Sequence, residues 1–469
     1  MYKWFLCLRY LRKRRIAFFG IAAVMLCVAL LIVITSLFSG FIERYLEYSD
    51  RIWGEIVLEP YQEMSGYEEL ARHLEELPSV ATAEPVLQIS GLLYVGTGDV
   101  RGVQLVGIDL AKHSRDPVFR KGLLLQNGPG APSFALSESA REQAGEWLRA
   151  RLARDIEEAD LPVGAILSIG ILGAPQEQTD EYNRQAIRRQ IENGLPLVIT
   201  AGIRSRGEGE TARKIQGRCW AVDAVQIGLH EADSAYVYLP FAYLQDWAGQ
   251  TGPDGTKQCL ASVQIRRAPG FGPETVKQQV REAWKQYVKT NLGWPDQAAR
   301  NVAIYSSSEN EMVKIFTHEI RKQLGVMQMM MGLICLVTAL LVFVTLFMIV
   351  TQKRRDMGII RGLGGSRRGL AMLFLYYGLS IGVVGTALGL FLGVLATRNI
   401  NLLEAALTRL LGFKVWKSGV YMFSHIPDEV AWNSVGWILA AGVGTAVLGA
   451  ALPAWRAARL HPVENLRYE

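Results

Sequence analysis

Four long uncharged segments stand out along the chain, at residues 16–42, 323–352, 369–397 and 430–455. Each is longer than the ~20 apolar residues that a helix needs to cross a hydrocarbon layer of about 30 Å. One such segment would also fit a buried helix of a soluble protein, but four favour a membrane protein. The first segment is too long for the apolar part of a signal peptide and has no small-residue cleavage site after it. We therefore expect it to be a membrane anchor.

Residues 43–322, between the first two spans, mix short alternating segments with longer amphipathic ones, which predicts an α+β domain. The expected strands are residues 54–60, 83–95, 103–109, 164–172, 234–240 and 260–267, and the expected helices are 66–77, 137–159 and 273–288. The segment 173–218 is rich in charge and glycine and predicts mainly loops. The predicted fold class is a membrane protein, α-helical with four transmembrane helices and a large α+β extracytoplasmic domain between helices 1 and 2.

The helical pattern continues beyond the first two spans. After the first span no proline occurs until Pro60, and Ser308 with Glu311 has the spacing of a capping box before the second span. A helix from Ser308 to Val350 would be about 65 Å long, roughly twice the thickness of the hydrocarbon layer. We expect both spans to extend as stalk ends of the extracytoplasmic domain, and residues 1–15 to form a cytoplasmic interfacial helix.

The net charge of +6 and the pI of about 9.0 come from short segments beside the spans. Cations gather in residues 1–15, in the loop 353–368 and in the tail 456–469. Short cationic segments stay in the cytoplasm, so the N- and C-termini and the 353–368 loop are expected inside, and residues 43–322 and the loop 398–429 outside. Nucleic-acid binding would also explain a basic chain, but topology accounts for the charge, and we expect no nucleic-acid partner.

Motifs for catalysis and for binding of cofactors or metals are weak. The chain contains no Gly-Lys pair, so it lacks a phosphate-binding P-loop, and any ATP must be bound by another chain. The sequence GLSIG at 378–382 matches a nucleophile elbow but lies in a span without histidine. We interpret it as part of a stripe of small residues for helix packing, formed by Gly378, Gly382, Gly385, Gly389 and Gly393. The prediction is no catalytic, cofactor or metal site in this chain.

Two further groups of residues leave alternatives open. Cys219 and Cys259 are the only cysteines outside the membrane-proximal segments, and both a disulfide and two free buried thiols fit the sequence. A methionine cluster lies near the outer end of the second span. Met327, Met330 and Met331 could face an apolar cargo, because methionine adapts to irregular ligands, or could serve ordinary packing.

The segment KRRDMGIIRGLGGSRRGL at 353–370, followed by the glycine-striped span, resembles the FtsX-like permease domain of ABC transporters. The C-terminal LPAWRAARLHPVENLR at 452–467 is similar to the closing signature of that family. The resemblance implies that residues 353–368 are a cytoplasmic coupling helix that docks on a separate ATP-binding subunit. Asp356 stands where the family usually has glutamate. The implied coupling residues are Arg355, Asp356, Gly358, Ile359, Ile360, Arg361, Gly362, Gly364 and Gly365.

Three further segments resemble lipoprotein-releasing permeases of the LolC/LolE kind: the start of the chain, GLHEADSAYVYLP at 228–240 and GVYMFSHIPDEVAW at 419–432. This resemblance implies a MacB-like periplasmic core and a bacterial inner-membrane subunit of the type VII mechanotransmission kind. Such a subunit extracts lipoproteins from the outer leaflet with ATP and Mg²⁺ bound by a partner ATPase. Its further partners would be a second permease copy or paralogue, a periplasmic lipoprotein carrier and membrane lipids. Signalling to cell-wall hydrolases and efflux of small molecules or peptides are the alternatives.

Overall fold

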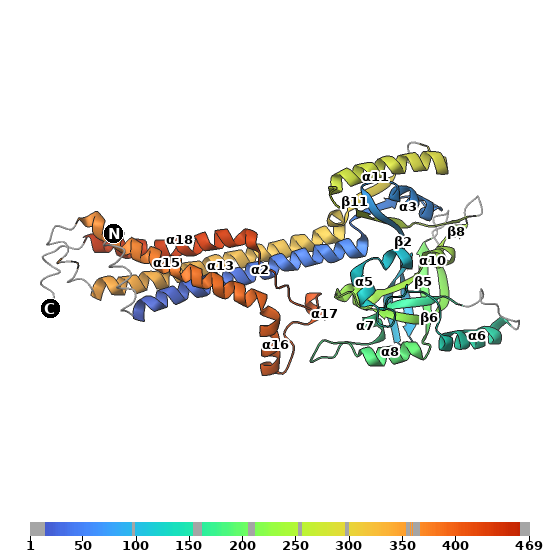
Figure 1. The fold of residues 1–469 in the computed structure, drawn as a ribbon, viewed down its shortest axis with the longest axis horizontal. Helices are drawn as coiled ribbons and strands as arrows, with labels where there is room; N and C mark the ends of the chain where they lie inside the picture. The colour runs from blue at the N-terminus through green and yellow to red at the C-terminus, as the bar shows by residue number, and fades with distance from the viewer. Residues whose placement is uncertain are drawn as a thin grey trace. The chain divides into compact units, whose positions relative to one another are not determined.

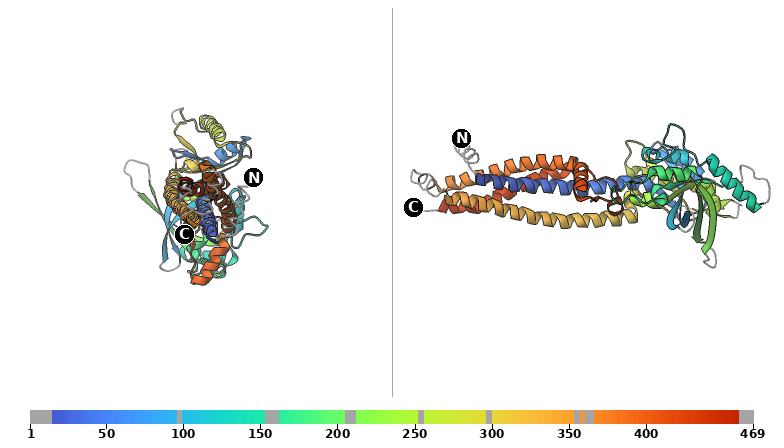
Figure 2. Two further views of the ribbon diagram at one scale, coloured as in Figure 1. Left: turned by 90° about the vertical axis from the view of Figure 1, so that its left-hand side faces the viewer. Right: turned by 90° about the horizontal axis from the view of Figure 1, so that it is seen from below.

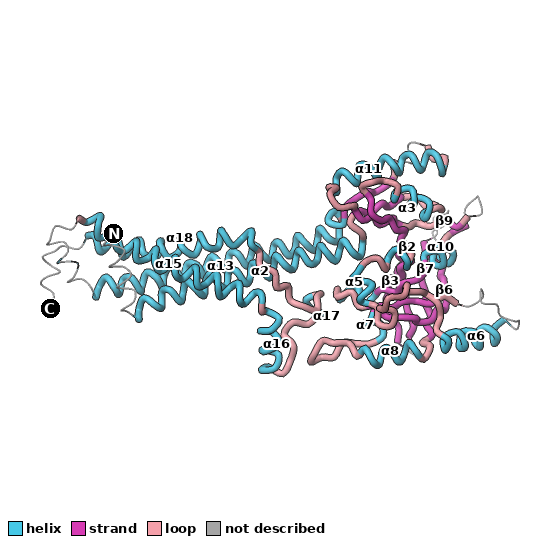
Figure 3. Tube along the Cα trace, in the orientation of Figure 1, coloured by secondary structure: helices cyan, strands magenta, loops and turns pink. Residues whose placement is uncertain are grey.

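The computed structural model of the chain describes residues 15–95, 99–152, 162–204, 212–251, 256–295, 300–352, 357, 359 and 366–459. The chain divides into two compact units. The first comprises Met1–Arg44, Ile315–Ala406 and Ile426–Glu469 and is called the membrane unit here. The second comprises Tyr45–Lys314 and Leu407–His425 and is called the sheet domain. Figure 3 shows that the strands belong to the sheet domain and that the membrane unit is helical.

Among the described residues, four helices are long and apolar enough to cross a membrane, which confirms the predicted spans. They are α2 (Arg15–Trp53), α13 (Glu311–Gln352), α15 (Arg367–Arg398) and α18 (Trp432–Arg459). Figures 1 and 2 show the four lying side by side. Helices α2 and α13, of 39 and 42 residues, continue unbroken beyond their uncharged segments. Each is about 60 Å long at ~1.5 Å per residue, as the sequence predicts.

The sheet domain contains the described strands β1 (Ile56–Pro60), β2 (Val80–Val95), β3 (Asp99–Ile108), β4 (Gly164–Ser168), β5 (Pro196–Arg204), β6 (Ala212–Val225), β7 (Tyr236–Pro240), β10 (Ser262–Arg267) and β11 (Val302–Ser306). They form one sheet in the order β11-β1-β10-β2-β3-β7-β4-β6-β5, and β5 also pairs with β2. The last six strands of that order, from β2 to β5, therefore close into a ring. A separate short hairpin joins β8 (Gln250–Thr251) to β9 (Lys257–Gln258).

The long strand β2 links the two halves of the sheet. Its first half pairs with β10, from Val80 to Val86, and its second half pairs with β3, from Leu87 to Val95. Residues 91–95 also pair with β5 on the other edge. The pairing of β3 with β7 and that of β4 with β6 are parallel, and the other pairings in the sheet are antiparallel.

Helices of the sheet domain bury one apolar face each. In α3 (Tyr67–Glu75) the buried residues Tyr67, Leu70, Ala71 and Leu74 recur at helical spacing. Helix α11 (Pro273–Tyr287) begins with proline at its first position and buries Trp284 completely. The other described helical elements of this domain are α4 (Leu110–His113), α5 (Pro117–Gly122), α6 (Glu138–Leu152), α7 (Ile169–Leu172), α8 (Arg184–Glu192), α9 (His230–Ala235), α10 (Phe241–Ala248), α17 (Ser418–Tyr421), a π-helical turn at Val288–Leu292 and the 3₁₀ helix Ser307–Glu309.

The structure corrects two predictions about elements. The segment 173–218 is not mainly loop, because it contains α8, β5 and the first half of β6. Strands β5 and β6 pair antiparallel along nine residues, from Pro196 with Trp220 to Arg204 with Ala212. Their alternation was obscured by arginine and lysine on the outward positions. The expected strand 164–172 ends at Ser168, where the chain turns into α7.

A capping box does precede α13, but it lies two residues earlier than predicted. Ser306 and Glu309 form it, on either side of the short 3₁₀ helix Ser307–Glu309. The Ser306 amide donates to Glu309 Oε2 at 2.9 Å, and Lys277 of α11 lies 2.9 Å from the same oxygen. These two contacts lower the pKa of Glu309. Because α11 supplies Lys277 as a partner for Glu309, the capping box uses this glutamate and not Glu311.

Candidate functional site

The glycine stripe of α15 is the packing surface that the sequence predicts. A Cβ built on Gly378 would lie 2.3 Å from the Cβ of Ala450 in α18. Further along α15, a Cβ on Gly389 would lie 2.7 Å from the carbonyl oxygen of Met25 in α2. Gly382 likewise faces α18, and Gly385 and Gly393 face α2. Small residues on α15 therefore let two neighbouring helices approach its backbone, and Ser380 belongs to this packed span, where its hydroxyl donates to the carbonyl of Tyr376.

An apolar groove lies between α2 and α13 in the membrane unit. Leucine, valine and isoleucine side chains line most of it, and Cys27 and Thr338 lie among them. The sulfur atoms of Cys27 and Cys335 are 3.7 Å apart. The full lining is Ala23, Leu26, Cys27, Leu30, Leu333, Ile334, Val337, Thr338 and Leu341.

The structure separates the three methionines suggested to face cargo. Met330 is exposed and Met327 is on the border of exposure, so both remain candidates for contact with an apolar partner. Met331 is buried in the core of the membrane unit at 6% exposure, which argues for packing. Helix α13 explains the difference, because successive residues point 100° apart and cannot share one face.

Most of the expected coupling residues lie outside the described residues: Arg355, Asp356, Gly358, Ile360, Arg361, Gly362, Gly364 and Gly365. Of the segment 353–365 the structure describes Met357 and Ile359. Ile359 is half-exposed, at 48%. Met357, which sequence analysis did not single out, is buried within the core of the membrane unit. The only sequence signal for it is one apolar residue directly after a run of charges.

Of the two alternatives left open for the cysteines outside the membrane-proximal segments, the structure has the free thiols. Cys219 and Cys259 are free thiols, and each is buried in the sheet domain. Cys219 lies on β6 opposite Leu197 of β5, whereas Cys259 forms an isolated bridge with Met64. Burial raises the pKa of both thiols to about 12. The two residues are therefore core residues on different elements, which is the other alternative that the sequence left open.

Within the sheet domain, the last turn of α2 is bonded to α5 and β10 by an ion-pair cluster around Asp116. Asp116 Oδ1 accepts from Arg51 Nη1 at 3.1 Å, and Asp116 Oδ2 accepts from Arg266 Nη2 at 3.1 Å. The Asp116 side chain is 6% exposed, whereas the two arginines are partly exposed. Asp116 also caps α5 by accepting from the Val118 amide at 2.9 Å. One carboxylate thus joins three elements: α2, α5 and β10.

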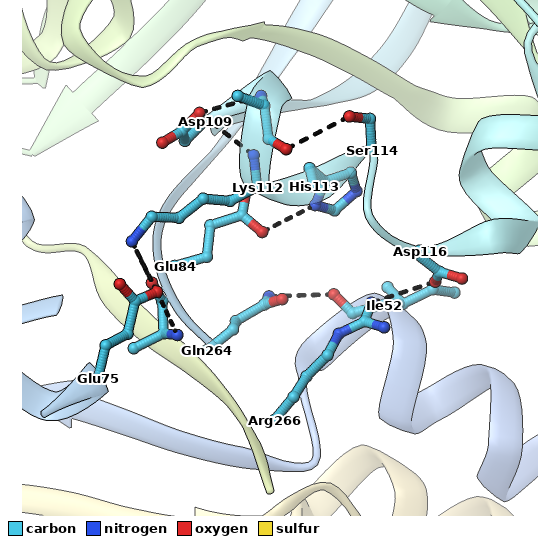
Figure 4. A network of polar contacts seen from close by, with 12 residues as sticks. Ile52, Glu75, Glu84, Asp109, Lys112, His113, Ser114, Asp116, Gln264 and Arg266 are labelled. Atoms are coloured by element: carbon cyan, nitrogen blue, oxygen red, sulfur yellow. Dashed lines mark hydrogen bonds and ion pairs between the residues drawn. The ribbon is translucent and has the colours of Figure 1, made fainter. Parts of the chain in front are cut away.

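The carbonyl end of α2 is capped from the sheet. Gln264 of β10 donates from Nε2 to the Ile52 carbonyl at 3.0 Å, as Figure 4 shows. Directly after the helix, Gly54 has a φ of +82°, and a Cβ there would lie 2.8 Å from the Cβ of Gln264. A glycine is thus required both by the backbone conformation and by the close approach of β10. Glu55 then pairs with Arg267 at 2.7 Å.

A second polar cluster adjoins the first in Figure 4 and fixes α4. Asp109 caps this helix, accepting from the Ala111 amide at 3.0 Å. Lys112 donates to Glu75 Oε1 at 2.8 Å and to the Ala83 carbonyl at 2.9 Å. His113 Nδ1 lies 3.1 Å from Glu84 Oε2. These bonds connect α4 with α3 and β2.

Two of the segments that resemble family motifs meet in the sheet domain. Leu229 and Phe423 form an antiparallel β-bridge, and the His230 amide donates to the Met422 carbonyl at 2.8 Å. The ring of Phe423 stacks on Tyr48 of α2, with centroids 5.5 Å apart. The loop after the third span is therefore bonded to the 228–240 segment, which sequence analysis did not foresee.

The same loop is held at a second point. The Ser418 amide donates to Asp180 Oδ2 at 2.7 Å, and Lys414 Nζ lies 3.3 Å from the Thr179 carbonyl. Trp416 donates from Nε1 to the Phe423 carbonyl at 2.9 Å. Backbone and side-chain bonds together fix residues 414–423 within the sheet domain.

Asp233 shapes the turn that receives the loop. Its carboxylate accepts from the amides of Ile227 at 2.5 Å and Gly228 at 2.8 Å. Burial raises the pKa of Asp233 to about 7 although both amide bonds oppose the rise. Gly228 has a φ of +99°, and a Cβ there would lie 2.8 Å from the hydroxyl oxygen of Tyr48. These contacts give physical roles to two residues that carry the family resemblance.

The polar side chains described above form helix caps, turns and ion pairs. Among the described residues, no group of three or more His, Cys, Asp or Glu side chains could hold a metal ion. The buried carboxylates have structural partners: Asp223, for example, accepts backbone amides of Leu124, Leu125 and Gln126.

Comparison with known proteins decides the family of the helical part. Residues 313–462 match the model of the FtsX-like permease C-terminal family. The chain carries an FtsX-like permease domain. Its described residues include α13, α15 and α18, the three membrane helices whose packing is given above, and the loop that docks on the sheet domain. The resemblance seen in the sequence is thereby confirmed.

Whole-chain relatives extend the similarity to the sheet domain. The chain is 25% identical to the lipoprotein-releasing system transmembrane protein LolC of Neisseria meningitidis serogroup B, over 98% of each chain. It is 23% identical to LolE of Haemophilus influenzae, over 96% of this chain and 94% of that one. Among solved structures, the periplasmic region of MacB from Actinobacillus actinomycetemcomitans is 12% identical and matches with a TM-score of 0.26. That match covers 56% of this chain and 94% of the MacB region. The similarity to LolC and LolE thus extends along nearly the whole chain.

Proposed function

We propose that the chain is the membrane subunit of an ABC transporter that releases lipoproteins from the outer leaflet of the bacterial inner membrane. The observation that carries this proposal is similarity to LolC and LolE relatives along both units of the chain. A match confined to residues 313–462 would support only a permease domain. Orientation follows from the cationic segments, which put both termini and the 353–368 loop in the cytoplasm and the sheet domain outside.

In this proposal ATP and Mg²⁺ are bound by a partner ATPase, and residues 353–366 receive its motion. Ile359 and Ile360 would press into an apolar groove on that subunit, and Arg355 and Arg361 would pair with acids around the groove. Gly364 and Gly365 would let the backbone return into α15, whose N-terminus is capped by Ser366 through the Gly369 amide at 3.0 Å. Met357, buried in the core of the membrane unit, would connect the coupling segment to the helices.

The motion would reach the sheet domain through α2 and α13. Each runs without a break from its uncharged segment to the sheet domain. The end of α2 is held by the Asp116 cluster, and the loop after α15 is bonded to the 228–230 turn. A helix that is continuous and bonded at its far end can transmit a displacement, whereas a frayed end would dissipate it.

The lipid-anchored cargo would bind at the groove between α2 and α13. That groove is lined by apolar side chains, which suits the acyl chains of a lipoprotein rather than its polypeptide. Met327 and Met330 are exposed elsewhere on α13 and could also contact such a ligand. A second permease copy or a paralogue would complete the cavity, and a periplasmic carrier would take the released lipoprotein. ATP binding does work on the cargo only if the affinity of the helices for the cargo differs between their two states.

The test is ATP-dependent release of a triacylated reporter lipoprotein from proteoliposomes that contain this chain, its second permease and its ATPase. Arg361→Glu and Ile360→Asp should reduce both ATPase co-purification and release, because a charge left buried without its partner costs a few kcal/mol. The matched control is Arg367→Glu, the same charge reversal at an exposed position on the first turn of α15.

Each outcome is informative. If both coupling variants retain wild-type ATPase binding and release, the coupling assignment is wrong. If ATPase binding is retained by the wild type but no lipoprotein is released, while a small-molecule or peptide substrate is transported, the efflux alternative replaces this proposal.

A further inference from the structure

The connection between α15 and α18 contains an amphipathic helix whose apolar side faces outward. Helix α16, Ile400–Leu411, begins two residues after Arg398, where α15 ends. The residues that it exposes include Leu402, Leu403, Leu407, Leu410 and Leu411, and Leu410 is 82% exposed. No residue of α16 is buried.

The half-buried side of α16 is polar. Asn401, Glu404 and Thr408 are spaced by three and four residues, so they share one face, and each is less exposed than the leucines. Asn401 clamps this face to the chain before α18: its Nδ2 donates to the Ile426 carbonyl at 3.0 Å, and its Oδ1 accepts from the Ile426 amide at 3.0 Å. The helix is thus held by its polar side, which leaves its leucines exposed.

This pattern is the reverse of that on a water-soluble surface helix, which buries its apolar side and exposes its polar side. Exposure of the leucine face to water would therefore be unfavourable. The residue before α16 follows directly on a membrane-spanning helix, and Ile426, to which α16 is clamped, lies six residues before α18, another span. The clamp consequently holds α16 near the ends of two spans, at a membrane boundary.

The charges agree with this boundary. Arg398 and Arg409 are exposed at the two ends of the segment, where their long side chains can reach lipid phosphates. The only acid of the helix, Glu404, lies on the half-buried polar face and not among the leucines. A leucine face flanked by arginines is the composition of helices that lie in the plane of a membrane interface.

We propose that α16 lies in the outer-leaflet interface, with its leucine face inserted among the lipids beside the third and fourth spans. The occupant of this face is the bilayer itself. The leucines would then reach about 5–10 Å into the boundary between headgroups and acyl chains. The inference depends on the spans and on the orientation proposed above, and not on which cargo the protein moves. It adds to the four spans a fifth membrane contact, parallel to the membrane surface.

The experiment uses the full-length chain in nanodiscs of phosphatidylethanolamine and phosphatidylglycerol. Spin labels are placed singly at Leu403, at Leu410 and, as the matched control, at Ala405, which is exposed on the polar arc of the same helix. Collision with oxygen reports lipid, and collision with a water-soluble nickel complex reports water. The oxygen-to-nickel ratio should be several-fold higher at Leu403 and Leu410 than at Ala405.

Equal ratios at the three positions would overturn the proposal, because the leucine face would then be in water. Immobile labels at Leu403 and Leu410 that collide with neither reagent would also overturn it, because a protein surface would then cover the face. Spin labelling requires replacement of the five native cysteines. A photoreactive residue at Leu410 in the otherwise native chain avoids that change. It should cross-link to phospholipid, and adducts only to protein would contradict the proposal. Loss of lipoprotein release plays no part in either readout.

Discussion

Asp116 Oδ1 accepts a hydrogen bond from Arg51 Nη1 at 3.1 Å, so the last turn of a helix that begins in the membrane unit is bonded to the cap of α5. The same carboxylate accepts from Arg266 on β10 through its other oxygen. Because Asp116 is nearly inaccessible to solvent, these two arginines are its charged partners in place of water. A substitution at Asp116 alone should therefore weaken the contact between α2, α5 and β10.

Asp116→Ala should lower the free energy of unfolding by about 1–3 kcal/mol. Breaking a fully buried ion pair costs about 3–5 kcal/mol, but here both arginines are partly exposed and can be solvated. Thermal unfolding of the detergent-solubilised chain measures the effect. Asp99→Ala is the matched control: Asp99 pairs with Arg101 at 2.9 Å on the surface, and its loss should cost less than about 1 kcal/mol. Equal losses in the two variants would contradict a special role for Asp116.

Asp233 should make the sheet domain less stable as pH rises from about 4 to about 7. Its pKa is raised from the model-peptide value of 3.8 to about 7 by burial. Between those values the folded state holds a proton that the unfolded state has lost, so folding is favoured at the acid end and this contribution vanishes as pH rises through 7. Asp233→Asn carries no titrating proton and should flatten the pH dependence of the melting temperature in this window. An unchanged slope would show that other groups cause it.

The glycine stripe predicts that two glycine substitutions in the membrane unit differ in how much they destabilise it. Gly389→Leu should destabilise the helix bundle by about 1–3 kcal/mol, because the new side chain would meet the backbone of α2. Gly436→Leu in α18 is the matched control, since no atom lies within 4 Å of a Cβ built there. Melting temperatures of the two variants in the same detergent compare them. Similar destabilisation by both would mean that the stripe is not a packing surface.

The free state of the two thiols of the sheet domain can be tested by alkylation. Cys219 and Cys259 should not react with iodoacetamide at pH 8 in the folded chain, because both are buried and their pKa values are about 12. Both should react fully after denaturation without reductant. Peptide mass mapping after denaturation reads this directly. Detection of a peptide pair linked through these cysteines would show that they form a disulfide instead.

Sequence patterns are sufficient to predict the membrane spans. They are insufficient to predict the contacts between residues far apart in the chain. A run such as 323–352 is read from composition alone, because every position must tolerate lipid. The glycine stripe was also readable, since its spacing repeats within one helix. The bond between Arg51 and Asp116 joins residues 65 positions apart, and that between Leu229 and Phe423 joins residues almost 200 positions apart. Neither pairing leaves a local pattern, so only the fold reveals it.

Helix α16 was missed for a different reason. Its leucines were counted within an outer loop, 398–429, because the segment is shorter than a span and contains Glu404 and Arg409. Its amphipathic period was present in the sequence, but only the structure shows that the polar side is the one turned inward. The placement of α16 follows from the periodicity of its leucines together with the burial of its polar side, and not from either alone.

Topology is the prediction on which the remaining proposals depend. The cationic segments place residues 1–15, 353–368 and 456–469 inside, and leave both the sheet domain and α16 outside. Single cysteines at Ala150 and Ala405 of a cysteine-free variant should therefore react with a membrane-impermeant maleimide in intact cells. Both positions are exposed, on α6 and on the polar arc of α16. Cysteines at Lys3, Gly365 and Asn465 should react only after permeabilisation. Labelling of Gly365→Cys from outside would place the coupling segment on the wrong side for an ATPase, and neither the docking of that subunit nor an outer-leaflet position for α16 could then stand.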